Sequence, residues 1–128
     1  MIIAFSWTSP PLLAGRKTMT WRGWDDRYSG LFRPGQLVSA YNRNPRNHGE
    51  KIATIRIVSV TKMPISELAD DDYEAEGLAY LHEHPEQCPK TIFGHKFEPW
   101  MVTREAFDER RRSVEVGYCV RFDLVSIP

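Results

Sequence analysis

Residues 50–63 read EKIATIRIVSVTKM, and this stretch more than any other decides the fold. Isoleucine, valine and threonine favour extended backbone, and here apolar side chains occur on both faces of the predicted strand. Such a strand is either buried on two sides or curls into a barrel. The closing stretch, SVEVGYCVRFDLVSI at 113–127, alternates and predicts a half-buried strand with Val116, Val120 and Phe122 largely inside.

Shorter elements are predicted around these two strands. Five strands and three helical pieces together predict an α+β domain built on a small, curved or closed sheet. The further strands are expected at 2–5 (IIAF), 17–22 (KTMTWR) and 36–41 (QLVSAY), the last after a Pro34-Gly35 turn. The helices are expected from Thr8 to a stop at Gly15, over 70–82 with Asp70 or Asp71 as cap, and over 103–112, with a loop at 83–99.

Length and composition limit the class of protein. A chain of 128 residues has the length of one domain, 1–128, and 41% hydrophobic with 12% aromatic residues is enough for a core. No apolar run approaches the ~18 residues of a membrane span, so we expect no membrane partner. The start, MIIAFSW, lacks a basic region and a cleavage site, so we interpret it as mature chain. Cys88 and Cys119 form no CxxC pair or disulfide framework, which favours a reducing, cytoplasmic setting.

The net charge of zero hides an asymmetry along the chain. Residues 16–62 carry ten basic and three acidic side chains, whereas residues 67–86 carry eight acidic and no basic ones. A basic half with interleaved aromatic residues is a candidate surface for phosphates and stacked bases. Alternatively, the basic and acidic segments face each other and neutralise. Segment charge alone does not choose between these two hypotheses.

Four segments in a fixed order carry a resemblance to a known family. They are AGRKTMTWR at 14–22, a PGQ turn at 34–36, KIATIRIVSVTK at 51–62 and LADDDYEAEG at 68–77. In this order they resemble the ASCH family, which implies a PUA-like β-barrel of about five to six strands with two to three short helices, and an association with RNA. Within that family the chain is most similar to small amidohydrolases that deacetylate N4-acetylcytidine. Residues 82–112 have no counterpart, and we interpret them as an insertion that covers the cleft as a lid or completes the core.

The resemblance also implies site residues. The catalytic lysine falls on Lys17, the threonine on Thr20 and the glutamate on Glu76, although a slip of one turn would choose Asp72 or Glu74 instead. We further expect substrate contacts from five side chains: Arg16, Trp21, Arg22, Trp24 and Glu74.

These residue types suit amide hydrolysis, which needs a nucleophile, a base and a proton source. Lys17 can activate the Thr20 hydroxyl only if burial lowers its pKa, and otherwise Glu76 is the base while Lys17 stabilises the oxyanion. Both assignments stay open at this point. In a regular strand, residues 17 and 20 would face opposite sides of the sheet. Lys17 must therefore belong to the turn before the strand, or a bulge must intervene.

Other polar clusters give weaker signals. His82, His84, Cys88 and His95 are metal-binding types, but their spacing matches no standard finger, so we predict no metal and no cofactor. The run 110–112, three arginines at a helix end, is interpreted as solvated charge. The expected partner is RNA or a modified pyrimidine nucleoside. The alternatives to an amidohydrolase are a non-catalytic RNA-binding regulatory module and a ribonuclease that uses the same basic cleft.

Overall fold

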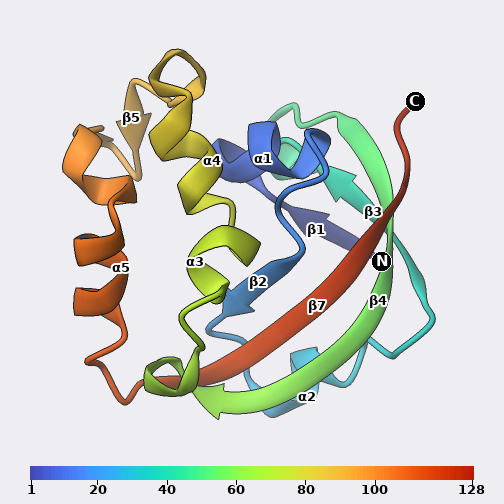
Figure 1. Cartoon of the computed structure of the whole chain (residues 1–128). Helices are drawn as coiled ribbons and strands as arrows, with labels where there is room; N and C mark the ends of the chain where they lie inside the picture. The colour runs from blue at the N-terminus through green and yellow to red at the C-terminus, as the bar shows by residue number, and fades with distance from the viewer.

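A five-stranded sheet in the order β1-β3-β4-β7-β2 organises the computed structural model, which describes residues 1–128 (Figure 1). β1 runs parallel to β3, and the other neighbours are antiparallel. The strands are β1 (Ile2–Ala4), β2 (Met19–Arg22), β3 (Leu37–Tyr41), β4 (Lys51–Pro64) and β7 (Val116–Ser126), and a separate hairpin is formed by β5 (Thr91–Ile92) and β6 (His95–Lys96).

Short helical elements connect the strands. The α-helices are α1 (Ser9–Leu13), α2 (Asp26–Ser29), α3 (Asp72–Ala75), α4 (Leu78–Glu83) and α5 (Arg104–Arg110). Single 3-10 turns occupy Ser6–Thr8, Pro45–Asn47, Ile65–Glu67, Pro85–Gln87 and Pro99–Val102. In Figure 1, α3, α4 and α5 stand together on one side of the sheet. None of the helices is long and apolar enough to cross a lipid bilayer.

The two long strands, β4 and β7, curve together along most of their length (Figure 1). Their register shifts at Thr54/Ile55 and at Ile57/Ser59, and such irregularities increase twist and bend a strand. Over its first half β4 alternates, with Ala53, Ile55 and Ile57 buried. Of the two alternatives for residues 50–63, the curled strand with one buried face is therefore the one observed.

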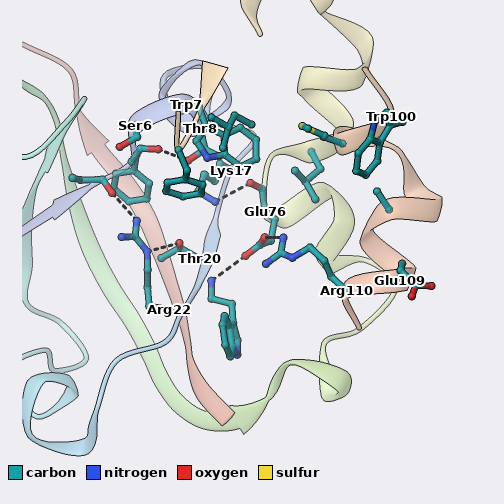
Figure 2. Close-up of a pocket in the computed structure, with 18 residues that line it drawn as sticks. Ser6, Trp7, Thr8, Lys17, Thr20, Arg22, Glu76, Trp100, Glu109 and Arg110 are labelled. Carbon is teal, nitrogen blue, oxygen red and sulfur yellow. Dashed lines mark hydrogen bonds and ion pairs between the residues drawn. The ribbon is translucent and has the colours of Figure 1, made fainter. Parts of the chain in front are cut away.

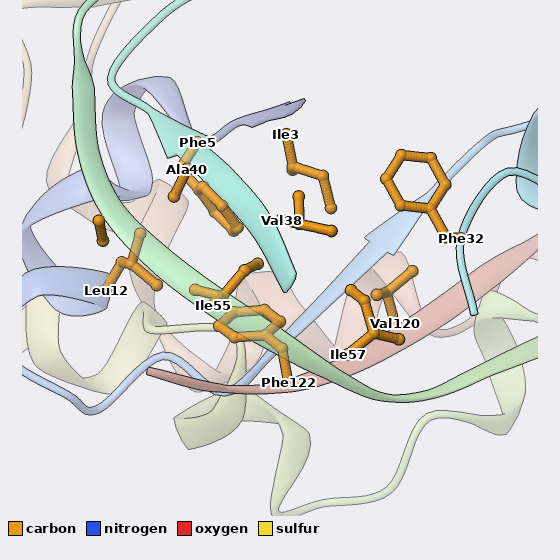
Figure 3. Close-up of a cluster of buried hydrophobic side chains, with 11 residues drawn as sticks. Ile3, Phe5, Leu12, Phe32, Val38, Ala40, Ile55, Ile57, Val120 and Phe122 are labelled. Carbon is orange, nitrogen blue, oxygen red and sulfur yellow. The ribbon is translucent and has the colours of Figure 1, made fainter. Parts of the chain in front are cut away.

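The concave face of the sheet carries the first hydrophobic core (Figure 3). Phe5 and Phe122 meet edge to face there, with ring centroids 5.5 Å apart. The other buried members are Ile3, Leu12, Phe32, Val38, Ala40, Ala53, Ile55, Ile57 and Val120. A second core lies between β2, β7 and the helices, and contains Met19, Ile65, Leu68, Leu78, Leu81, Val102, Phe107 and Cys119. Because β7 lies between both cores, its residues 117–120 are buried on both faces.

Three sequence predictions need correction. The helix expected over 70–82 is broken by Gly77, which adopts φ +90° between α3 and α4, and Asp71 at the N-cap makes no side-chain hydrogen bond. Val116 is 53% exposed, because β2 covers β7 only from Tyr118 onward and the start of β7 projects past it. The expected loop at 83–99 contains the β5–β6 hairpin and a 3-10 turn.

The edge strands β1 and β2 form no main-chain hydrogen bonds with each other, and a side chain links them instead. Arg22 Nη2 donates to the Ala4 carbonyl at 2.7 Å across the opening between them. The edge of β2 that faces away from β7 is covered by the α3–α4 junction, where the Glu76 carboxylate accepts from the Trp21 amide at 2.9 Å. Covered edges do not pair with other chains. The expected α+β class is confirmed.

Candidate functional site

A cavity of about 670 Å³ opens beside β2, between the sheet and the helices (Figure 2). Its apolar wall includes Phe5, Trp7, Trp21, Leu78, Ile92, Phe93, Trp100 and Met101. Its polar wall includes Lys17, Thr20, Arg22, Glu76, Glu109 and Arg110. The cavity thus gathers three polar residues of the 14–22 element and one acid of the 68–77 element, which lie far apart in the sequence.

Lys17 lies in the turn between α1 and β2, which starts at Met19, so the spacing problem with Thr20 does not arise. Its amide donates to the Pro11 carbonyl at 3.0 Å, and Gly15 supplies the φ of +75° that this turn needs. The side chain is 3% exposed, and Nζ donates to the main-chain carbonyl of Glu76 at 2.8 Å. Burial lowers the pKa of the Lys17 amine to about 8, and the Glu76 carboxylate only partly opposes this. A neutral amine is therefore accessible near physiological pH.

Gly77 sets the distance between the α3–α4 junction and the Lys17 turn. A Cβ added at Gly77 would lie 2.6 Å from Pro11 Cγ and 3.3 Å from Lys17 Cβ. A side chain there would push the Glu76 carbonyl away from the Lys17 amine. Glycine suits this position because it adopts the positive φ and because it lets the α3–α4 junction approach Pro11 closely.

Glu76 is 7% exposed and its carboxylate is held on both oxygens. Oε1 accepts from the Trp21 amide at 2.9 Å, and Oε2 lies 3.5 Å from Arg110 Nη1. Helix α3, which ends just before Glu76, is fixed to β7 by Asp72, whose carboxylate contacts both terminal nitrogens of Arg121 at 2.9 and 3.2 Å. Because Asp72 makes this ion pair and does not line the cavity, it serves to position α3.

Thr20 and Arg22 lie two residues apart on β2 and are in direct contact. Arg22 Nε donates to Thr20 Oγ1 at 2.9 Å, which leaves the hydroxyl proton of Thr20 for another partner. Burial lowers the pKa of the Arg22 guanidinium, which has no carboxylate within 4 Å and packs over the Phe5 ring at 5.5 Å. The side chain of Thr20 therefore faces a cationic group on one side.

Three of the residues expected at the site do not line the cavity: Arg16, Trp24 and Glu74. Arg16 lies on the surface, where it pairs with Glu74 at 2.9 Å and with Glu83 at 2.6 Å. Trp24 stacks on Phe32 at 4.5 Å and packs against the first core. Among the three acids that sequence left open, Glu76 alone reaches the cavity.

The structure adds cavity residues that the sequence did not indicate. Arg110 lines the cavity beside Glu76 while its side chain stays 47% exposed, and Arg112 is 78% exposed, as solvated charges are. Arg111 is the exception in this run, since it is mostly buried in contact with Asp70 and Asp108. Ala106 also lines the cavity, four residues before Arg110. This spacing places both residues on one face of α5, and it is the sequence signal that could have indicated Arg110. The segment 82–112 thus supplies cavity wall as well as second-core residues such as Phe107.

Two of the candidate metal-binding residues of 82–95, His84 and Cys88, contact main-chain carbonyls instead. His84 Nδ1 contacts the Tyr80 carbonyl at 2.8 Å, and Cys88 Sγ contacts the Leu81 carbonyl at 3.3 Å. No three histidine, cysteine or acidic side chains come together in a way that would hold a metal ion.

The charged segments do not simply neutralise each other. Of the ten basic residues in 16–62, only Arg16 and Lys62 form ion pairs, and Lys62 does so with Asp26 inside its own segment. The acidic segment is paired mainly with arginines of the C-terminal part: Arg110, Arg111 and Arg121. Much of the basic half is therefore free to meet an anionic partner.

Comparison with known proteins gives matches in structure only. No family model matches the chain, and no curated protein matches it in sequence. Protein EF3133 from Enterococcus faecalis V583, of family DUF984, aligns with a TM-score of 0.56 at 20% identity, over 96% of this chain and 72% of its own. The ASCH domain from Lactobacillus crispatus JV V101 aligns with a TM-score of 0.50 at 19% identity, over 90% of this chain and 68% of its own. This chain has the fold of an ASCH domain. The ASCH resemblance found in the sequence is thus confirmed at the level of the fold, and identities this low carry no activity across.

Replacing Lys17 with methionine is expected to stabilise the ASCH fold by about 2 kcal/mol at pH 7. Burial that lowers the lysine pKa from 10.5 to about 8 costs the charged form about 3 kcal/mol, and loss of the hydrogen bond to Glu76 offsets about 1 kcal/mol. Urea unfolding at pH 7 measures the difference. The exposed control Lys51→Met should change stability by less than about 0.5 kcal/mol.

The pH dependence of this difference follows from the lowered pKa. Between pH 8 and 10.5 the unfolded chain binds a proton that the folded chain lacks, so wild-type stability rises with pH in this window. The advantage of Lys17→Met should therefore shrink at pH 10. A variant less stable than wild type at pH 7 would show that no charged amine is buried there.

Proposed function

We propose that this ASCH-fold protein hydrolyses the amide bond of an N4-acylated cytosine, releasing a carboxylic acid and the free base amine. The observation that carries the proposal is the meeting of Lys17, Thr20 and Glu76, all nearly buried, at one largely apolar cavity. Buried polar groups are costly, and groups with shifted pKa values in a cleft are typical of active sites. The resemblance of the 14–22 element to N4-acetylcytidine amidohydrolases supports the choice of substrate.

In this proposal Thr20 is the nucleophile and Lys17 is the base. The Thr20 oxygen accepts a hydrogen bond from Arg22, so its proton is free to pass to the neutral amine of Lys17. The oxygen attacks the acyl carbon, the electron pair of the C=O bond moves to the acyl oxygen, and the nearby Arg22 guanidinium stabilises that oxyanion. The Lys17 ammonium then protonates the departing 4-amino nitrogen, which leaves an ester on Thr20. Water, deprotonated by Lys17, hydrolyses that ester and releases the acid.

Glu76 acts mainly by positioning in this scheme. Both oxygens of its carboxylate are already engaged, one by the Trp21 amide and the other by Arg110. Its main-chain carbonyl orients the Lys17 amine. The other assignment, with Glu76 as base and Lys17 as fixed positive charge, predicts the opposite pH dependence.

The walls of the cavity suit a planar, aromatic substrate. Trp7, Trp21 and Trp100 line the cavity, and Trp100 is 61% exposed. Indole rings bind flat heterocycles by stacking, which is nearly independent of the identity of the base. The polar groups near Thr20 would then distinguish an acylated amine from an unmodified one.

The test is release of acetate from N4-acetylcytidine by the purified protein, measured together with formation of cytidine. N4-methylcytidine, which has the same ring but no amide, is the matched control and should remain unchanged. Absence of release from every N4-acylated cytosine would contradict the proposal. If such a protein bound single-stranded RNA with steep salt dependence, the non-catalytic RNA-binding module would be favoured, and RNA cleavage would favour the ribonuclease.

A further inference from the structure

A second cavity, of about 350 Å³, adjoins the first on the other side of Arg22. Ala4 and Arg22 line both cavities, so the side-chain bridge between β1 and β2 forms the partition. The second cavity is otherwise walled chiefly by Trp24, Tyr28, Asn44 and Pro45. A ligand seated in the first cavity therefore has the second cavity beside it, across Arg22.

Arg22 at this partition is a guanidinium with unused donors. Of its five N–H groups, one meets the Thr20 hydroxyl and one the Ala4 carbonyl, which leaves three. No carboxylate lies within 4 Å, although burial has removed much of its hydration, as the lowered pKa indicates. A partly dehydrated guanidinium without a carboxylate partner favours an anion, and its planar fork matches two oxygens of a phosphate.

The second cavity offers aromatic surface beside free positive charge. Trp24 and Tyr28 meet edge to face at 5.1 Å, and Tyr28 is 40% exposed. Arg43 and Arg46 flank Asn44 and Pro45, and both arginines are exposed without an ion-pair partner. A stacked base next to a backbone phosphate requires this combination of groups.

We propose that the two cavities hold two consecutive nucleotides of a single strand. The acylated cytosine occupies the first cavity, the phosphodiester contacts Arg22, and the neighbouring base stacks against Trp24 and Tyr28. The ligand is thus an oligonucleotide, at minimum a dinucleotide, and not a free nucleoside. This inference rests on the proposed function for the contents of the first cavity.

The experiment compares kcat/KM for N4-acetylcytidine, its 5′- and 3′-monophosphates, and dinucleotides that carry one flanking nucleotide on either side. One stacked base is worth roughly 5- to 150-fold in affinity, so one of the two dinucleotides should exceed both monophosphates by at least about fivefold. Tyr28→Leu, which removes the ring but keeps apolar contact with Trp24, should reduce this ratio to near one. Tyr80→Ala, a tyrosine that stacks on His84 outside both cavities, is the control and should leave the ratio unchanged.

Each result decides the inference. Equal use of monophosphates and dinucleotides by the wild type, or an unchanged ratio in a folded Tyr28→Leu variant, would overturn it and leave the proposed function intact. If no acylated substrate is hydrolysed, the proposed function fails, and the second cavity is tested by binding. Tryptophan fluorescence would then compare cytidine monophosphate with cytidine-containing dinucleotides. Tighter binding of the dinucleotide that is lost in Tyr28→Leu would support the second cavity, and equal affinities would overturn it.

Discussion

Replacing Phe122 with alanine is expected to lower the free energy of unfolding by about 3–5 kcal/mol, the range for a large aromatic side chain removed from a core. Phe122 is 2% exposed, lies on β7 between β4 and β2, and packs edge to face on Phe5. Part of the loss is apolar surface returned to water, and part is the cavity that a rigid sheet cannot close. Urea or thermal unfolding monitored by circular dichroism measures the change.

Phe93 is the matched control for this substitution. It is 89% exposed at the tip of the β5–β6 hairpin, so Phe93→Ala should change stability by less than about 0.5 kcal/mol. A loss below about 1 kcal/mol for Phe122→Ala would mean that β7 is peripheral and that the two cores do not depend on it. The effect should also reach the site, because Phe5 lies under Arg22 at 5.5 Å and near Lys17 Nζ at 6.0 Å.

The fold was predictable where local pattern and tertiary position agree. The strands β3 and β4 and the helix α5 begin and end close to where composition and turn residues placed them. The strand 113–127 was predicted in position but not in burial, because alternation cannot indicate where a neighbouring strand ends. Val116 is exposed only because β2 stops short of it. Gly77 is a weak point of a helix by its residue type alone, but its close packing on Pro11 is a contact between segments that no local pattern contains.

The candidate site was predictable in part, and the family resemblance contributed more to that prediction than residue type and spacing did. Spacing alone required Lys17 to lie in a turn, and it does. Which acid reaches the cavity was not predictable, because a shift of one turn exchanges Glu76 for Asp72, and only their partners distinguish them. Arg110 was missed because a basic residue at a helix end has an adequate local explanation, and its approach to Glu76 depends on how α5 docks.

Lys17→Met is expected to lower kcat/KM for N4-acetylcytidine by about 10²–10⁴, the usual value of a general base, while leaving the protein folded and more stable. This opposite movement of activity and stability separates a catalytic role from a structural one, since a lysine needed only for folding would lower both. The exposed control Lys51→Met should retain wild-type activity.

The pH profile of the wild type then distinguishes the two roles left open for Lys17. As a base it must be neutral, so kcat/KM should rise about tenfold per pH unit and level off above its pKa of about 8. As a fixed charge beside an oxyanion it must be protonated, and kcat/KM would instead fall above pH 8.

Thr20→Ala distinguishes attack by the threonine from direct attack by water. If Thr20 attacks, this variant should lose about as much activity as Lys17→Met, Thr20→Ser should recover much of it, and cytidine should appear in a burst ahead of acetate. A mild loss in Thr20→Ala with no burst would mean that water attacks directly and the threonine only orients it.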